Sequence, residues 1–384
     1  MGLPRHGAGR PADQPGLHGL PALPGGECAP AAGRRAVSLP PVWARRLVIA
    51  PAIVLLAAGL LTTLPVWLLL ALAVSPLVPG RLRVPRLVFL LIVYVVWDAA
   101  ALIVLAALWI AAGAGRWIRG PVFQRAHYVV TGAFLRTLFW FARWSLHLAI
   151  DVVGTDPDTA QPGRPEIVVS RHAGPGDSFT LIHALVNWFA REPRIVLKAA
   201  LQWDPAVDVL LNRLPNRFIT PGRTATDRLA DQIGELATGL DDNDAFVIFP
   251  EGGNFTPRRR VKAIARLRAS GLDEMAVKAE GLRNLLPPKP GGLLAAIDAA
   301  PDAGVIFVAH TGLDRMITIG DVWRELPMDK RLVMRFWSVP PEEVPAGERE
   351  RIDWLYAWWA RIDAWIEENR PAPRPLWIDR GTAR

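Results

Sequence analysis

The distribution of apolar and charged residues separates an N-terminal part with long apolar runs from a C-terminal part with short ones. Residues 47–80 contain no charged residue, and residues 87–115 contain only Asp98. About 20 apolar residues suffice to cross a bilayer, so each run is long enough. The pattern therefore predicts membrane-embedded helical segments within residues 41–120.

Arginines flank both apolar runs on every side, so the positive-inside rule gives no clean orientation. They are Arg45, Arg46, Arg81, Arg83, Arg86, Arg116 and Arg119. A carboxylate such as Asp98 in mid-membrane costs roughly 2.5 to 3.5 kcal/mol, so it must be shielded, protonated or shallow. One hypothesis is a shallow or re-entrant hairpin that keeps all the arginines on the cytoplasmic side. The alternative is two ordinary spans joined by a tolerated basic loop.

From residue 151 onward, short β-type runs alternate with helical patterns. Strands are predicted at residues 166–170, 194–198, 217–219, 245–249 and 304–309, and helices at 178–191 and 224–240. Strands that alternate with helices indicate a largely parallel sheet with right-handed crossovers. We therefore expect an α/β catalytic domain over residues 151–345, with a mostly parallel sheet flanked by helices and preceded by the membrane helices.

Tryptophan-rich amphipathic helices are predicted on both sides of this domain. In residues 121–150 an apolar stripe adjoins Trp140 and Trp144, which fits an interfacial helix or an ordinary core-facing helix. The stripe consists of Phe134, Leu138, Phe141 and Leu148. Within residues 346–384 a helix with an apolar stripe is predicted. Either the stripe packs on its own domain, or the tryptophans of the helix lie at the level of the lipid headgroups. That stripe consists of Ile352, Leu355, Trp359, Ile362 and Ile366.

The composition limits the classes of binding partner and of bound metal or cofactor that the chain can be expected to have. The net charge of +8 favours an anionic partner, and the apolar runs favour a lipid bilayer over nucleic acid. A single cysteine, Cys28, excludes an intramolecular disulfide and a cysteine-cluster zinc site, and the histidines lack metal-ligand spacing. We expect no metal and no bound cofactor. Residues 1–40 are rich in Gly, Pro, Ala and Arg, which predicts a disordered tail.

Candidate chemistry begins after the strand at residues 166–170, where His172 precedes Asp177 by five positions in a Gly- and Pro-rich turn. A histidine is a natural base for removing a hydroxyl proton, and a neighbouring carboxylate can hold its ring in the required tautomer. The sequence has no nucleophile elbow and no active-type cysteine, so direct transfer is favoured over a covalent intermediate. The alternatives are a structural histidine and a helix-capping aspartate.

A second polar group follows the strand at residues 245–249, where Glu251, Gly252 and Gly253 form a tight turn. Glycines there let backbone amides approach an anion, whereas Glu251 itself would repel one and is expected to grip a hydroxyl or order the loop. The alternative is a simple turn. The basic run at residues 258–268 is either a solvated helix face or a patch that attracts anionic headgroups by about 1 kcal/mol per cation.

Residues from about 150 to 312 resemble the catalytic domain of the 1-acylglycerol-3-phosphate (lysophosphatidate) acyltransferase family. The first block of the family is represented by His172 and Asp177, and a lysine after a strand by Lys198. The third block is represented by Phe249, Pro250, Glu251 and Gly252, and the fourth by the hydrophobic strand at residues 305–309.

The resemblance implies that His172 is the general base, that Asp177 is its partner and that the Glu251 turn belongs to the acceptor site. It implies transfer of a fatty acyl group from acyl-CoA or acyl carrier protein, as co-substrate, to a lysophospholipid. With 1-acylglycerol-3-phosphate the product is phosphatidate, a step of phospholipid biosynthesis. The expected location is the cell membrane, with the catalytic domain on the cytoplasmic face.

Departures from the family pattern concern the acceptor. Ser170 and Arg171 stand where the family has an asparagine before the histidine. The arginine that ends the second block is missing, so Arg217 or Arg223 would have to hold the acceptor phosphate. Gly253 and Asn254 replace a Thr-Arg pair, so a second phosphate contact would come from Arg258 or Arg259. Two alternatives therefore stay open: another lysolipid or a glycolipid as acceptor, and a non-catalytic basic membrane scaffold.

Overall fold

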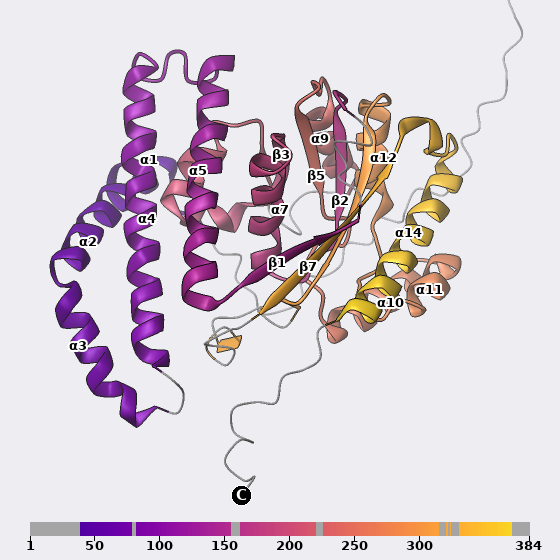
Figure 1. Ribbon diagram of the computed structural model, residues 1–384. Coiled ribbons are helices and arrows are strands. Elements are labelled where there is room, and N and C mark those ends of the chain that lie inside the picture. Colours follow the sequence, from indigo (N-terminus) through magenta and orange to yellow (C-terminus); the bar gives the residue numbers. More distant parts are fainter. Residues whose placement is uncertain are drawn as a thin grey trace, which may run out of the picture.

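The computed structural model describes residues 39–78, 82–154, 162–219, 226–314, 320–321, 323 and 330–370. The disordered tail expected before residue 39, Cys28, Arg81 and Arg223 lie outside the described residues. In the described part, a layer of long N-terminal helices lies beside an α/β unit, as Figure 1 shows in indigo and violet.

The N-terminal layer contains two helices that are long and apolar enough to cross a membrane, Val42–Thr62 and Arg83–Ala111. The first of these comprises α1 (Val42–Ala44), a π-helical turn (Arg45–Ile49) and α2 (Ala50–Thr62). The second is α4 (Arg83–Ala111). Between them lie α3 (Leu64–Val74) and a 3₁₀ turn (Ser75–Leu77). The first apolar run is thus not one continuous helix. The helix breaks at Thr63, and Pro65 lies in the first turn of α3. Proline lacks the amide that would continue the preceding helix.

One sheet of seven strands forms the core of the α/β unit. The strands are β1 (Ala149–Val153), β2 (Glu166–Ser170), β3 (Glu192–Lys198), β4 (Arg217–Ile219), β5 (Asp244–Ile248), β6 (Gly304–Thr311) and β7 (Arg331–Val339). Their order is β1-β7-β6-β2-β5-β3-β4, and β6 with β7 is the one antiparallel pair. The mostly parallel sheet and the five predicted strands are confirmed. The sequence did not predict β1 and β7.

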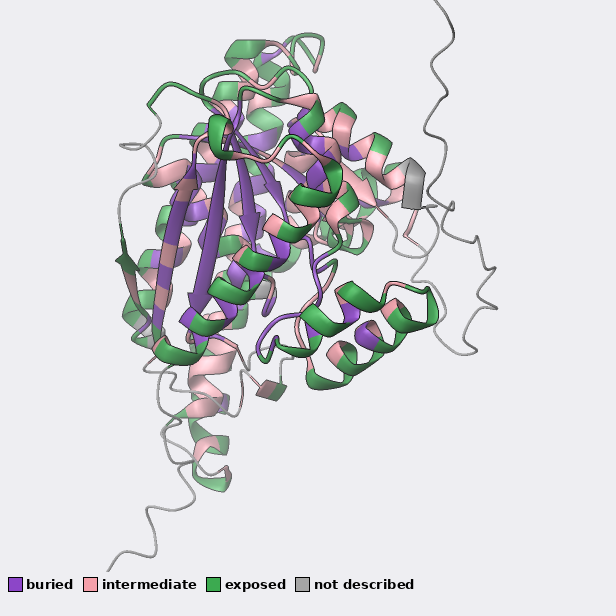
Figure 2. Cartoon of the chain, turned by 90° about the vertical axis from the view of Figure 1, so that its right-hand side faces the viewer, coloured by how far each residue is buried: buried purple, intermediate pink, exposed green. Residues whose placement is uncertain are grey.

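Helices cover both faces of this sheet, and the strands between them are largely buried (Figure 2). One face packs on α5 (Pro121–Leu146) and α7 (Pro175–Asn187). The other packs on α9 (Thr226–Ala237), α12 (Pro290–Ala299) and α14 (Glu348–Asn369). The shorter elements are a 3₁₀ turn (Ala199–Trp203), α8 (Pro205–Leu211), α10 (Pro257–Ala269), α11 (Asp273–Glu280) and a 3₁₀ turn (Pro341–Glu343). Alternate residues of β2 serve opposite faces, so the whole strand is apolar or buried.

The two tryptophan-rich helices pack against this sheet. On α14, Leu355, Trp359 and Ile366 are fully buried in the core, so its stripe packs on its own domain. On α5, Leu135 and Phe139 enter the opposite core layer, with Trp140 and Trp144 left exposed. Phe134, Leu138 and Phe141 of the predicted stripe are only partly buried, so the face of α5 that packs is centred one position further along than predicted. The exposed tryptophans remain available to a lipid interface.

Polar residues of the N-terminal helices face the segment formed by residues 199–211. The buried Arg45 lies 2.5 Å from the fully buried carboxylate of Asp208. Asp98 is buried and lies close to the side chain of Asp204 and to the backbone of Ala206. Protein groups thus shield the carboxyl group that the sequence places in the second apolar run.

Candidate active site

The candidate site lies at the edge of the sheet where three neighbouring parallel strands, β6, β2 and β5, end. β2 ends at Ser170, and His172 follows two residues later; β5 ends at Ile248 shortly before Glu251. The backbone amide of Phe255 donates to the carbonyl of His172 at 2.9 Å, which ties the two strand-end loops together. Carboxyl ends of parallel strands are the usual position for a site in such sheets.

The His172 imidazole is 13% exposed and lies against the ring of Phe249, with centroids 4.8 Å apart. Its Nδ1 atom is 4.0 Å from Asp177 Oδ2, beyond hydrogen-bond distance, and has no partner among the described residues. Burial lowers the pKa of His172 to about 4, although the Asp177 carboxylate acts in the opposite direction. The ring is therefore neutral near pH 7 and able to accept a proton.

Asp177 is the third residue of α7 and is buried. Its Oδ2 atom accepts hydrogen bonds from the backbone amides of Ala173, at 2.6 Å, and Gly174, which fixes the loop that carries His172. The other oxygen, Oδ1, is buried without a partner in the described part of the chain. Asp177 thus serves the helix start as a capping residue and lies beside the imidazole, so both readings of it are compatible.

Glu251 is 3% exposed and uses both carboxylate oxygens on backbone amides. Oε1 accepts from the amide of His172 at 2.7 Å, and Oε2 accepts from the amide of Leu286 at 2.9 Å. Burial raises the pKa of Glu251 to about 7, against the nearby positive charge of Arg171. Of the two expected roles, this geometry supports the ordering of the loop.

Two basic side chains, Lys289 and Arg259, lie against the glycine turn that follows Glu251. Gly252 has a φ of +65°, and a Cβ there would lie 3.0 Å from Lys289 Nζ. At Gly253 the nearest such contact is Arg259 Nη1 at 3.5 Å. Burial lowers the pKa of Lys198 at the end of β3, and the nearby Arg259 acts in the same direction. The amide of Gly252 donates to the Phe249 carbonyl at 3.0 Å, so what the turn offers an anion is the two neighbouring cations, Lys289 and Arg259.

Arg217 and Arg258, the other predicted arginines in the described part of the chain, are not brought to this turn. Arg217 begins β4 at the edge of the sheet and forms an ion pair with Glu235 at 2.9 Å. Arg258 is exposed on α10, whereas its neighbour Arg259 turns back and donates to the Asn254 carbonyl at 3.0 Å. Of the two arginines considered for a second phosphate contact, Arg259 is the one directed at the glycine turn.

Sequence reasoning missed Lys289 and His310. Lys289 precedes α12 and its amide donates to the Pro250 carbonyl at 2.9 Å, a contact between loops far apart in sequence. His310 lies near the end of β6 with its Nε2 atom 3.7 Å from Asp177 Oδ2. It is the residue after the predicted strand at 304–309, so its position at a strand end was an available signal. Across the described ranges, no group of three or more His, Cys, Asp or Glu side chains is arranged to hold a metal ion.

Comparison with known proteins identifies the domain. Residues 151–311 match the family model described as Acyltransferase. No curated protein matches the chain at a significant level. Among solved structures, the 1-acyl-sn-glycerophosphate (LPA) acyltransferase PlsC from Thermotoga maritima is 14% identical, with a TM-score of 0.40 over 85% of this chain and 100% of that one. The resemblance to acyltransferases is confirmed: residues 151–311 are similar to that family.

Proposed function

We propose that the chain transfers a fatty acyl group from acyl-CoA or acyl carrier protein to the free hydroxyl of 1-acylglycerol-3-phosphate, giving phosphatidate. The observation that carries this proposal is the neutral imidazole of His172, held beside Asp177 at the strand-end edge of an acyltransferase-type domain. The acceptor oxygen attacks the thioester carbonyl as His172 Nε2 takes its proton, and the departing thiolate receives that proton back.

Asp177 supports this step by stabilising the imidazolium that forms. Its Oδ1 atom and the Nδ1 atom of His172 are both buried without a partner among the described residues, and Nδ1 lies 4.0 Å from the other carboxylate oxygen, Oδ2. A small side-chain rotation brings them to hydrogen-bond distance when the ring becomes charged. Such tightening is common when an empty site binds its substrate.

The cations around the glycine turn support an acceptor that carries a phosphate monoester. Arg259 and Lys289 approach this turn, Lys198 lies near Arg259, and the chain lacks the family's second-block arginine. In this proposal Lys289 and Arg259 hold the phosphate next to the amides of the turn, and His172 faces the free hydroxyl.

The membrane arrangement that we propose is the shallow hairpin with the catalytic domain on the cytoplasmic face. Asp98 is fixed against Asp204 of the domain, so only the part of α4 from Arg83 to Asp98 extends beyond that contact. Fifteen residue steps of 1.5 Å give about 22 Å, less than the hydrocarbon thickness of about 30 Å. Cysteine labelling from outside tests this: a probe at position 83 that reacts in intact cells contradicts the hairpin.

The test of the activity is acyl transfer by the detergent-solubilised protein to lysophosphatidate, other lysophospholipids, a glycolipid and glycerol 3-phosphate. His172→Ala is expected to lower the rate by about 10²- to 10⁴-fold, the usual contribution of a general base. His183→Ala is the matched control: burial lowers the pKa of that histidine to about 4 as well, but its ring packs on Phe139.

Each outcome has a distinct meaning. His172-dependent product from lysophosphatidate alone supports the proposal, and His172-dependent product from another acceptor keeps the chemistry and replaces the substrate. If neither acyl-CoA nor acyl carrier protein donates to any acceptor, with the protein folded, the basic membrane scaffold becomes the better account.

A further inference from the structure

A cavity lies beside α14, where β7 extends beyond β1. β1 has five residues and β7 has nine, and their paired register ends with Val153 opposite Arg335. In the described sheet the rest of β7 has no strand on that side, and a cavity of about 500 Å³, the β7 cavity, opens there. Small-molecule sites occupy roughly 300 to 1,000 Å³, so this volume suits a ligand. The lining comes from the end of β7, from Gly154 after β1, and from Trp358 and Arg361 on α14.

Two arginines of the β7 cavity stack on indole rings instead of pairing with carboxylates. The Arg335 guanidinium lies 4.9 Å from the centre of the Trp337 ring. Arg361 lies 4.8 Å from the Trp358 ring and 5.6 Å from the Trp337 ring. In the part of the chain that the structure describes, neither guanidinium forms an ion pair or a hydrogen bond, even with the acidic lining residue Glu343. Stacking leaves the N–H groups around a guanidinium free, so both cations can still bind an anion.

The indole of Trp337 adds a buried donor without an acceptor. This residue is 8% exposed, and its Nε1 atom has no hydrogen-bond partner among the described residues. The Nε atom of Arg335 is likewise buried without a described partner. Because an unsatisfied buried donor is costly, native structures usually supply such a donor with a ligand, an ion or a water. The two arginines and the indole therefore favour the same kind of ligand, an oxyanion.

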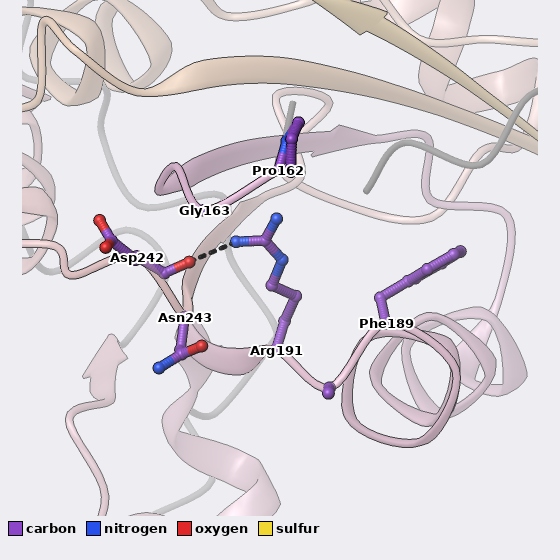
Figure 3. A pocket seen from close by; sticks show the side chains of 7 residues that line it. Pro162, Gly163, Phe189, Arg191, Asp242 and Asn243 are labelled. Carbon is purple, nitrogen blue, oxygen red and sulfur yellow. Dashed lines mark hydrogen bonds between the residues drawn. The ribbon is translucent and has the colours of Figure 1, made fainter. Parts of the chain in front are cut away.

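A second cavity shows how a structural arginine is held in this fold. That cavity, of about 250 Å³, contains Arg191, which donates to the Asp242 carbonyl at 2.6 Å (Figure 3). Arg191 also pairs with the buried carboxylate of Glu166 at 3.0 Å. The charge and the donors of Arg191 are thus used within the protein. Those of Arg335 and Arg361 are not used by any described residue, so the comparison singles out the β7 cavity as the one suited to an external anion.

We propose that the β7 cavity binds the phosphate group of a small molecule, with Arg335 and Arg361 as charge partners and Trp337 Nε1 as a further donor. A phosphate monoester carries about −1.5 to −2 charges at pH 7, so it matches two guanidinium groups better than a carboxylate does. The site is separate from the candidate active site. β7 runs antiparallel to β6, so Trp337 lies opposite Phe307 and the lining continues away from the catalytic end of β6.

Three probes that share a phosphate group distinguish the source of the ligand. Inorganic phosphate tests the anion alone, glycerol 3-phosphate represents a lipid headgroup, and adenosine 3′,5′-bisphosphate represents the nucleotide end of coenzyme A. Binding to the full-length solubilised protein is measured by isothermal titration calorimetry in a phosphate-free buffer. The glycine turn also has cations, so each titration is repeated with Lys289→Met, which weakens binding at that turn and leaves the β7 cavity unaltered.

The test variants are Arg335→Met, Arg361→Met and Trp337→Phe. Each removes a donor to a charged group, so each is expected to weaken binding by about tenfold or more. Arg361 is exposed on α14, so its replacement is expected to leave the melting temperature unchanged. The matched control is Arg349→Met, which removes another exposed arginine of α14, one that pairs with Glu274 at 3.1 Å. This control is expected to bind every probe as the unaltered protein does.

The outcomes are distinct. Binding that persists in Lys289→Met and is weakened in Arg335→Met and Arg361→Met, but not in Arg349→Met, supports the proposal, and the probe that binds most tightly identifies the source of the phosphate. The proposal is overturned if no probe binds the unaltered protein, or if Arg361→Met binds as tightly as the unaltered protein. Neither result depends on acyl transfer, because His172→Ala is expected to leave this binding unchanged.

Discussion

Replacing Glu251 by glutamine isolates the effect of its buried charge on the stability of the site. The carboxylate accepts from the amides of His172 and Leu286. Glutamine keeps one acceptor oxygen but sets an NH₂ group against the other amide, as the hydroxyl of the protonated carboxyl group does, so it loses a hydrogen bond only relative to the charged form. The variant also lacks a charge that burial disfavours, and the resulting gain in the free energy of unfolding depends on pH.

The magnitude follows from the pKa of Glu251, which burial raises from 4.5 to about 7. The folded protein therefore keeps a proton that the unfolded chain has already lost, and stability falls as the pH rises from 4.5 to 7. At 1.36 kcal/mol for each pH unit, a rise of about 2.5 units corresponds to roughly 3 kcal/mol. Below pH 4.5 and well above pH 7 both states carry the same charge, so the contribution is constant there.

Thermal melting of the unaltered protein and of Glu251→Gln between pH 4 and pH 9 measures this contribution. In a domain of this size about 3 kcal/mol corresponds to roughly 6 to 12 °C in melting temperature. The variant is expected to melt close to the unaltered protein at pH 4, where Glu251 is protonated, and above it by that amount towards pH 8. A difference between the two proteins that stays constant across the series would refute the reasoning, because Glu251 would then ionise alike in the folded and unfolded chains.

Two further perturbations test the packing around the site. Asp208→Ala leaves the buried Arg45 without its anion, and we expect a loss of about 3 to 5 kcal/mol in the free energy of unfolding, measured by denaturant titration. Gly312→Ala is expected to lower the melting temperature strongly, because its φ is +117° and a Cβ would lie 2.1 Å from the Arg331 carbonyl oxygen. The control Gly239→Ala, with a φ of +63° and open space around it, is expected to cost only about 1 kcal/mol, so equal losses would contradict the steric argument.

The sequence indicated the central strands well because burial on both faces leaves a local signal. β2 and β5 are short apolar runs between polar turns, and every residue in them is buried. β1 and β7 lacked that signal. They pair with each other across some 180 residues, β1 is a partly exposed edge strand, and β7 carries Arg331 and Arg335 on the strand itself. Such pairing depends on the rest of the fold rather than on the local pattern.

The residues of the candidate site also fall into those that the strand pattern could predict and those that it could not. His172 and Glu251 each follow a buried strand, so parallel strands alone place them at one edge, and the 2.7 Å hydrogen bond between them follows that expectation. Lys289 reaches the same edge from a loop before α12, where no strand pattern points to it. The reverse holds for Arg217, whose place beside a predicted strand suggested a phosphate contact, while its guanidinium pairs with Glu235 on α9.

The contacts between the N-terminal helices and the domain bear on the site itself. Lys198 ends β3, and the next residues form the turn Ala199–Trp203. Arg45 donates to the carbonyl of Gln202 in this turn at 3.3 Å, and Tyr94 on α4 donates to Asp204, the residue that follows it. Lys198, whose charge acts on His172, is therefore four residues from groups fixed by the apolar helices. In the membrane arrangement proposed above, seating of the hairpin and placement of Lys198 are coupled through these contacts, so the hairpin would position the site as well as attach the domain to lipid.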